Sequence, residues 1–258
     1  MCTLLIGRGV HPRLPLVLAA NRDEFHARAS APPAFLDPEH RVMGGRDLVA
    51  GGTWLGVTDG RFVTAVTNHR THRPPDPQRS SRGALVMELL RAGSLEAADA
   101  IVGALAIGRY NEGNLLYGDA QALHVAYLRD ETPTRVIEVP RGWSVLTNGE
   151  LTDREGFPKI DRLSALAAQG PEEVDALLAH LHAALGDHHR TPVEAIASPP
   201  AGSIFTRELL RELSAICVHA PGYGTVSSSI LLFGEGGALE RWDHTEGAPC
   251  THERRRIV

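Results

Sequence analysis

Short apolar runs separated by turn residues make up the first part of the chain. Residues 3–6 and 15–20 are apolar runs of the length of buried strands. Residues 53–57 and 61–67 flank Asp59-Gly60, a pair favoured in two-residue hairpin turns because both positions adopt a positive φ. The pattern therefore predicts antiparallel strand pairs at the start of the chain.

Helical patterns occur as two pairs of segments. Ser81 precedes a helix to about residue 90 that ends at Gly93, and Ser94 caps a second helix to about residue 105. The second pair covers residues 158–168 and 171–185, with Pro171 suited to a first helical position. Further strand-like runs lie at 114–117, 122–128, 134–139, 143–146, 225–233 and 238–242. Strands and helix pairs in alternation predict an α+β fold of two stacked antiparallel sheets with helices outside.

Composition and charge restrict the class of protein. The 258 residues are 43% hydrophobic and contain no repeat or linker, so we expect a single domain over residues 1–258. The net charge of −5 indicates no nucleic-acid partner. No apolar run approaches the ~20 residues of a membrane span, and the N-terminal segment lacks a signal-peptide pattern. We therefore expect a cytoplasmic protein with no membrane span; the oligomeric state is left open.

Cysteine and histidine positions predict neither a metal site nor a disulfide framework. The three cysteines lie far apart, in an odd number and without zinc-site spacing. His180 and His182 face different sides of their helix, and we interpret these two and His188-His189 as exposed polar residues. No cofactor is expected. The glycine-rich residues 44–52 lack the Gly-Lys-Ser/Thr of a phosphate loop and are predicted to be loops beside the site.

The first residues, Met1-Cys2-Thr3, carry the most specific chemical signal. Once Met1 is removed, Cys2 holds a thiol with an ordinary pKa of about 8.5 and an α-amine with a pKa of about 7.7–8.0. One residue then supplies both nucleophile and base. The predicted second strand ends at Arg22-Asp23, which pairing would bring close to Cys2. Arg22 would favour the thiolate and Asp23 would orient the amine, although a turn with a surface salt bridge is equally compatible with these residues.

Motifs in order along the chain resemble the NRDE family, also called the transport and Golgi organisation protein 2 family. The matching segments are Met1-Cys2-Thr3, Ala20-Asn-Arg-Asp-Glu-Phe25, Gly45-Arg-Asp47, Gly51-Gly-Thr-Trp-Leu-Gly56, Thr67-Asn68, Ser81-Arg-Gly83, Asn114-Leu115, Leu146-Thr-Asn-Gly149 and Tyr223-Gly-Thr225.

This resemblance implies the four-layer α-β-β-α sandwich of the N-terminal-nucleophile hydrolases, similar to cholylglycine hydrolase and penicillin V acylase. It implies that Cys2 is the nucleophile, attended by Arg22 and Asp23, and that Asn148 and Asn68 stabilise the oxyanion. The substrate-binding residues expected beside them are Asn21, Arg46, Trp54 and Arg82. In the related hydrolases another arginine occurs late in the chain; here Ile204 takes its place, and Arg82 or Arg207 is a possible substitute.

Two functions follow from the resemblance. The first is a cysteine amidohydrolase or acyltransferase that acts on a small amide, lactone or acyl thioester through an acyl-Cys2 intermediate. The second, suggested by haem trafficking among relatives, is a non-catalytic carrier of haem or another hydrophobic small molecule. His69, His72 or a cysteine thiolate is a possible haem ligand, and the sequence does not choose among them.

Overall fold

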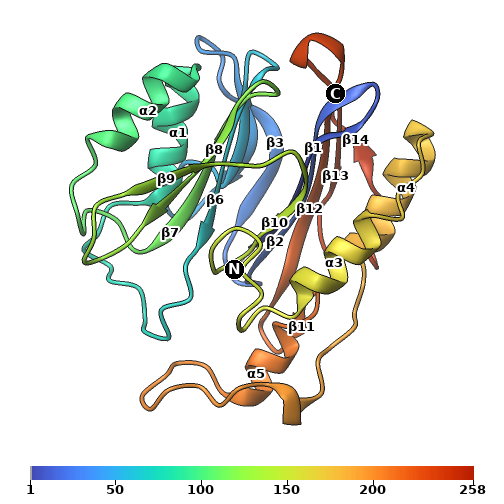
Figure 1. Cartoon of the computed structure of the whole chain (residues 1–258). Coiled ribbons are helices and arrows are strands. Elements are labelled where there is room, and N and C mark those ends of the chain that lie inside the picture. Colours follow the sequence, from blue (N-terminus) through green and yellow to red (C-terminus); the bar gives the residue numbers. More distant parts are fainter. Residues whose placement is uncertain (1) are drawn as a thin grey trace.

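Two seven-stranded antiparallel sheets lie face to face in the computed structural model, which describes residues 2–258 (Figure 1). The first sheet has the order β10-β1-β2-β12-β13-β14, with β11 also paired to β12. The adjacent inner strands β1 and β2 of this sheet come from the very start of the chain. The bounds are β1 Cys2–His11, β2 Leu14–Phe25, β10 Gly142–Leu146, β11 His219–Ala220, β12 Tyr223–Phe233, β13 Leu239–Thr245 and β14 Arg255–Arg256.

The second sheet is a meander in which each strand pairs with the next one along the chain, from β3 to β9. It contains the predicted Asp59-Gly60 hairpin, and both turn residues have positive φ values of 49° and 64°. The bounds are β3 Ser30–Asp37, β4 Val42–Asp47, β5 Leu55–Thr58, β6 Phe62–Asn68, β7 Gly113–Gly118, β8 Leu123–Leu128 and β9 Arg135–Glu138.

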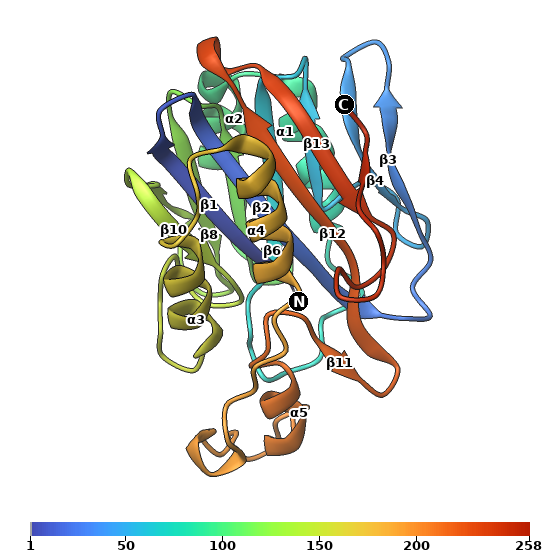
Figure 2. The same cartoon turned by 90° about the vertical axis from the view of Figure 1, so that its right-hand side faces the viewer.

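Helices cover the outer face of each sheet (Figures 1 and 2). On the second sheet lie α1 (Arg82–Ala92) and α2 (Leu95–Gly103), whose N-caps Ser81 and Ser94 accept hydrogen bonds from main-chain N–H groups, as their side chains predict. On the first sheet lie α3 (Lys159–Ala167) and α4 (Val174–Leu185). A short α5 (Arg207–Glu212) lies near β11, at the lower end of both views.

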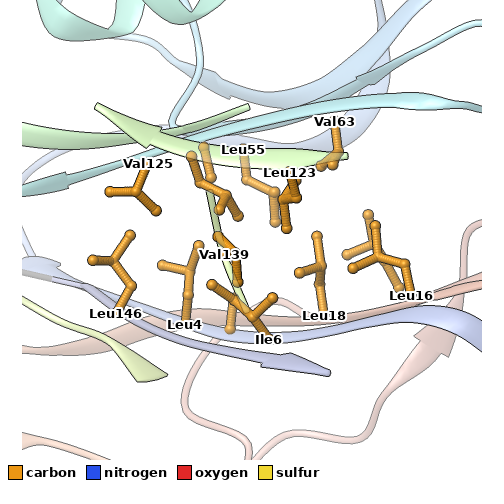
Figure 3. Packing of buried hydrophobic residues seen from close by; sticks show 14 of the residues in the cluster. Leu4, Ile6, Leu16, Leu18, Leu55, Val63, Leu123, Val125, Val139 and Leu146 are labelled. Atoms are coloured by element: carbon orange, nitrogen blue, oxygen red, sulfur yellow. The ribbon is translucent and has the colours of Figure 1, made fainter. Parts of the chain in front are cut away.

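Three layers of apolar side chains hold these four layers of structure together. Between the sheets, alternate residues of β1 and β2 such as Leu4 and Leu18 meet Leu55 and Val125 of the opposite sheet (Figure 3). The residues between them, such as Leu5 and Ala19, pack on α3 and α4. A third cluster joins α1 and α2 to the second sheet. The prediction of two stacked antiparallel sheets with helices outside is confirmed.

Some elements differ from those that the sequence predicted. Residues 44–47, expected to be loop, belong to strand β4, where a Cβ on Gly44 would lie 2.8 Å from the carbonyl oxygen of Leu55. Glycine is therefore needed there for close approach of the two strands. Helix α4 begins at Val174 rather than at Pro171, because the side chain of Glu173 caps its first N–H groups. Among residues 2–258, no helix is long and apolar enough to cross a membrane.

Candidate active site

The register of the first two strands places Cys2 directly opposite Arg22. Cys2 is the first described residue of β1, and its side chain joins Leu4 and Ile6 on the face between the sheets. It is only 9% exposed. Removal of Met1 concerns a residue outside the described range. The sequence predicted that pairing of the first two strands would bring Arg22 close to Cys2, and the observed strand register agrees with this prediction.

Asn148 and Asn68 meet beside the cysteine. On the other side of β1, strand β10 pairs Leu146 with Leu4, and this register continued by two residues brings Asn148 level with Cys2. The Nδ2 of Asn148 donates a hydrogen bond of 2.7 Å to the carbonyl oxygen of Asn68, the last residue of β6 in the second sheet. The two amides predicted for the oxyanion therefore come together from different sheets.

A cavity of about 1060 Å³ opens at this point. Its wall includes Cys2, Arg22, Asp23 and Asn68. Three predicted substrate-binding residues, Arg46, Trp54 and Arg82, also line it. Asn148, a described residue, contacts the lining residue Asn68 rather than forming part of the wall itself. Seven of the nine predicted site residues thus share one cavity, and an eighth touches it.

Asn21 is the exception among the predicted residues. Its Nδ2 donates to the carbonyl oxygens of Leu185 at 2.9 Å and Ile216 at 3.0 Å, on the helix side of the sheet. Successive side chains of a strand point to opposite faces, so the residue before Arg22 points away from the cavity. Asn21 therefore anchors the end of α4 to the sheet, and the structure does not place it in the cavity wall with the other predicted substrate-binding residues.

Asp23 lies in a dense polar environment. Its Oδ1 accepts a hydrogen bond of 2.7 Å from the hydroxyl of Thr225, and its main-chain oxygen accepts one of 2.8 Å from the phenol of Tyr223. Its Oδ2 lies 3.9 Å from the Nζ of Lys159. Burial raises the pKa of Asp23, while Lys159 opposes that rise. The carboxyl group is thus held in one orientation beside the nucleophile.

Lys159 is the functional candidate that sequence reasoning missed. It is the only lysine in a sequence with 26 basic residues, it opens helix α3, and it is 4% exposed. Its Nζ also lies 3.3 Å from the hydroxyl of Thr3, the neighbour of the cysteine. Burial lowers the pKa of this amine. The sequence signal was the single lysine itself. All other Lys/Arg positions of the chain are arginine, and a lysine amine can lose its proton when buried whereas a guanidinium cannot.

The thiol of Cys2 is not activated by Arg22 alone. Burial raises the pKa of Cys2, Asp23 raises it further, and Arg22 lowers it by less than burial raises it. Arg22 thus favours the thiolate, as expected from the sequence, but burial opposes it more strongly. A buried thiol of raised pKa must pass its proton to a base when it attacks.

The cavity wall contains seven arginines and seven acidic residues, and four of the arginines lack a carboxylate partner among the described residues. Arg22, Arg46, Arg70 and Arg82 line it, and none of the four forms an ion pair with a carboxylate within residues 2–258. Arg28, in contrast, pairs with Asp47 at 2.7 Å. Their side chains instead donate hydrogen bonds to neutral acceptors: Arg22 to Ser30 Oγ, Arg46 to the Leu36 carbonyl, Arg70 to the Gly156 carbonyl, and Arg82 to the Glu112 carbonyl.

Burial makes two of these cations especially receptive to an anion. Burial lowers the pKa of Arg70 to about 10, and it also lowers the pKa of Arg82. Arg70 stacks over the ring of Phe157 at 4.4 Å. A half-buried guanidinium without a carboxylate partner is stabilised when an anionic ligand binds, since the ligand replaces part of the lost solvation.

The remaining residues considered from the sequence differ in whether they line the cavity. Ile204 lines the cavity, whereas Arg207 hydrogen-bonds Ser198 outside it, so Arg82 is the cation nearer to the nucleophile. Of the two histidines considered as haem ligands, His69 lines the cavity. His72 instead contacts the hydroxyl of Ser203 at 3.0 Å and lies outside the wall formed by the described residues.

Comparison with known proteins identifies the family. Residues 1–246 match the model of the family described as Transport and Golgi organisation 2. The chain belongs to this family. The Transport and Golgi organization protein 2 homolog of Bos taurus is 31% identical, covering 93% of this chain and 92% of that protein. The Homo sapiens homolog is 29% identical, covering 86% of this chain and 83% of that protein.

Solved structures show which fold this family member has. A mutant conjugated bile acid hydrolase from Clostridium perfringens superposes with a TM-score of 0.55 at 9% identity, covering 100% of this chain and 97% of the other. Penicillin V acylase from Agrobacterium tumefaciens gives 0.51 at 12% identity, with 97% and 93% covered. An N-acylethanolamine-hydrolyzing acid amidase ortholog from Caenorhabditis elegans gives 0.52 at 12% identity, with 90% and 92% covered. The fold is that of N-terminal-nucleophile hydrolases.

Proposed function

We propose that this protein is a cysteine amidohydrolase or acyltransferase that acts on a small amide, lactone or acyl thioester. The observation that carries the proposal is the position of Cys2. Cys2 is the first residue of the inner strand β1 and pairs with Arg22 of β2. It also lines a cavity of about 1060 Å³. The structural neighbours support the same chemistry, since their names denote a bile acid hydrolase, an acylase and an acid amidase.

The burial of the Cys2 thiol defines the first step. Because burial disfavours the thiolate, the sulfur attacks the acyl carbonyl carbon as its proton passes to a base. In the form that begins at Cys2, the α-amine of the same residue is that base. The tetrahedral intermediate expels the amine, alkoxide or thiolate of the substrate, which takes the proton, and leaves a thioester on Cys2. Water or another acceptor then attacks the thioester and regenerates the thiol.

Two amides support stabilisation of the negative oxygen in this step. A side-chain amide carries two N–H donors, and one donor of Asn148 is used by the carbonyl of Asn68. The second donor of Asn148, together with the Asn68 amide in the wall, is proposed to bind the oxyanion. Asp23, fixed by Thr225, is proposed to orient the α-amine of Cys2.

The arginines in the wall favour an anionic substrate. Arg82 and Arg70 are half-buried and have no carboxylate partner among residues 2–258. A carboxylate, phosphate or sulfonate on the acyl donor would pair with them. We therefore propose that the substrate joins an acyl group to a portion that carries negative charge.

Covalent labelling tests the proposed function. Protein processed to begin at Cys2 is treated with an anionic acyl thioester and stopped in acid, and its intact mass and peptide map are measured. One acyl group on Cys2, absent from the Cys2→Ser variant and from protein that retains Met1, is the expected result. Absence of a Cys2 adduct with amide, lactone and thioester donors alike would overturn the proposal.

The size and rim of the cavity support one alternative, a carrier of haem or another hydrophobic molecule. The volume is at the upper end of the ~300–1,000 Å³ common for ligand sites. Its rim includes two exposed apolar side chains, Phe25 at 63% and Ile204 at 49% exposure. A carrier would bind haem equally well with Cys2→Ala or with Met1 retained. Binding that survives both changes, with no acylation of Cys2, would favour carriage.

A further inference from the structure

Four soft-metal ligands from remote parts of the chain meet near the end of α4. His188 follows this helix, Cys217 and His219 flank the start of β11, and Cys250 lies in a turn near the C-terminal end of the described chain. One ligand atom of each lies within 4.8 Å of all the others. None of the four lines the cavity around Cys2, so the cluster is a feature distinct from the proposed catalytic site.

The spacing within the cluster is tight. The sulfurs of Cys217 and Cys250 are 3.6 Å apart. The Nε2 of His219 lies 3.3 Å from the sulfur of Cys250 and 3.6 Å from that of Cys217. The ring of His188 packs against that of His219 with their centroids 5.0 Å apart.

These distances agree with ligands arranged around one tetrahedral zinc ion. Zinc–sulfur bonds of about 2.3 Å and zinc–nitrogen bonds of about 2.0–2.1 Å at tetrahedral angles separate two sulfurs by about 3.8 Å, and a sulfur and a nitrogen by about 3.5 Å. The three observed separations, 3.6, 3.3 and 3.6 Å, lie within a few tenths of these values. A disulfide would need sulfurs about 2.05 Å apart and would not account for two histidines.

We propose that His188, Cys217, His219 and Cys250 form a zinc site. Two thiolates and two imidazoles are a ligand set typical of structural zinc, and four protein ligands leave no open position for a catalytic water. Cys217 is buried while the other three side chains are exposed, so an ion can enter from solvent. The site would connect the end of α4, the start of β11 and the C-terminal turn.

The surrounding main chain already holds the ligands in place. The N–H of Cys217 donates to the carbonyl of Asp187 at 2.9 Å, which fixes the segments of Cys217 and His188 to each other. The turn of Cys250 is closed by the N–H of Thr251, which donates to Ala248 at 3.0 Å. A Cβ on Gly186 would lie 3.7 Å from the Cα of Cys250, so this turn packs against the end of α4.

A short path of hydrogen bonds connects the cluster with the candidate active site. The N–H of Val218, between two of the ligands, donates to the hydroxyl of Thr225 at 2.9 Å. The same hydroxyl donates to Asp23 at 2.7 Å. Bound zinc would therefore fix the strand pair that holds Asp23 in position.

This proposal goes beyond two expectations from the sequence. His188 is exposed, as its position indicated, and the cysteine spacing alone had predicted no metal site. Cys217 and Cys250 are 33 positions apart, and they meet only because β12, β13 and the turn after them return the chain to α4. His189, the neighbour of His188, is exposed and provides a matched control.

Metal analysis of the wild-type protein is the primary test. Protein with no histidine tag, purified with a reductant and without a chelator, is expected to contain one zinc per chain by mass spectrometry of its elements. Replacement by Co²⁺ should give the visible bands of a tetrahedral site together with thiolate charge-transfer absorption. Alkylation of Cys250, which is exposed, should become fast only after a chelator removes the metal.

Variants assign the ligands. Cys250→Ser and His219→Ala should lose zinc and the cobalt spectrum, whereas His189→Ala and Cys2→Ala should retain both. Retention by Cys2→Ala would exclude the candidate nucleophile as a ligand and separate this test from that of the proposed function. A reduced wild-type protein that takes up neither zinc nor cobalt would overturn the proposal. So would a native mass lower by two hydrogens with a peptide linking Cys217 to Cys250, because the pair would then be a disulfide.

Discussion

The side-chain amide of Asn148 donates a 2.7 Å hydrogen bond to the main-chain carbonyl of Asn68. The first residue follows strand β10 of one sheet and the second ends strand β6 of the other. The bond therefore joins the two sheets beside the cavity. The main-chain N–H of Arg70 donates to the carbonyl of Asn148 at 2.9 Å, so the junction is fixed by both side chain and main chain.

Loss of the Asn148 amide should affect the chemical step. We expect Asn148→Ala to lower kcat by about 10²–10³-fold, the cost of one oxyanion donor. Gln169→Ala, which removes an amide bonded to Ala165 at 3.2 Å on the exposed end of α3, is the control and should keep full activity. Steady-state kinetics with the acyl donor that labels Cys2 measures both. An equal kcat in the two variants would remove Asn148 from the proposed mechanism.

The buried amine of Lys159 should have a lowered pKa. Burial disfavours its charged form, and the nearby Asp23 only partly compensates. Because Lys159 is the only lysine, protein labelled with ¹³C at the lysine ε-carbon gives a single side-chain signal to follow as pH changes. We expect the midpoint below the ordinary lysine value of about 10.4. A midpoint at or above that value would show that the ion pair outweighs burial.

Breaking the Lys159–Asp23 pair should cost much of the stability. We expect Lys159→Met to lower the free energy of unfolding by about 3–5 kcal/mol, because it removes the buried cation that lies 3.9 Å from the buried carboxylate of Asp23. Adding Asp23→Asn should recover part of this loss. Urea unfolding of the four proteins in the double-mutant cycle measures the coupling. Losses that simply add would mean that the two side chains do not interact.

His244 should make the fold less stable in acid. Burial lowers the pKa of His244 to about 4, helped by the charge of Arg255. Because the folded-state pKa is lowered, the stability contribution of His244 is complete above the ordinary pKa of about 6.5 and is lost as pH falls towards the folded-state value. We expect the free energy of unfolding to decrease by about 2 kcal/mol between about pH 7 and about pH 5. Urea unfolding at both pH values is the measurement. His244→Gln should have a smaller loss, and an unchanged loss would assign it to other groups.

Arg82 should select for negative charge on the substrate. We expect Arg82→Gln to lower kcat/KM for an anionic acyl donor by about 10–100-fold, corresponding to a charged hydrogen bond of ~1.5–3 kcal/mol. A neutral donor with the same acyl group should lose much less. Arg207→Gln, outside the cavity, is the charge-matched control. Equal losses for anionic and neutral donors would contradict an anion-binding role for Arg82.

The strands that could be predicted from sequence are those that carry a clear apolar pattern. Strand β3 could not, because it contains Pro32 and Pro33, which normally argue against a strand. It is the edge strand of the second sheet, and its register shifts between Ala31 and Ala34, around the two prolines. An edge strand with a bulge can accommodate residues that lack an N–H.

The candidate site was predictable wherever side chains meet through neighbouring strands. Pairing of β1 with β2 was sufficient to expect Cys2 beside Arg22. It was not sufficient to predict that Arg22 points into the cavity and Asn21 away from it. Adjacent side chains of a strand point to opposite faces of the sheet, so an error of one residue in the register exchanges the two faces. Lys159 reaches the site from a helix layer, and its distance from Asp23 depends on how α3 packs on the sheet. Local patterns contain no information on such packing.

The burial of the only lysine has a consequence for how this protein can be handled. Across residues 2–258 the folded surface presents no side-chain primary amine, since Lys159 is enclosed. Succinimidyl esters and amine-coupled sensor surfaces would therefore react with a backbone α-amine. In protein that begins at Cys2, that amine is the proposed base of the reaction. Amine coupling would then yield a folded but inactive protein, and attachment through carboxylates or a C-terminal tag would be needed to keep it active.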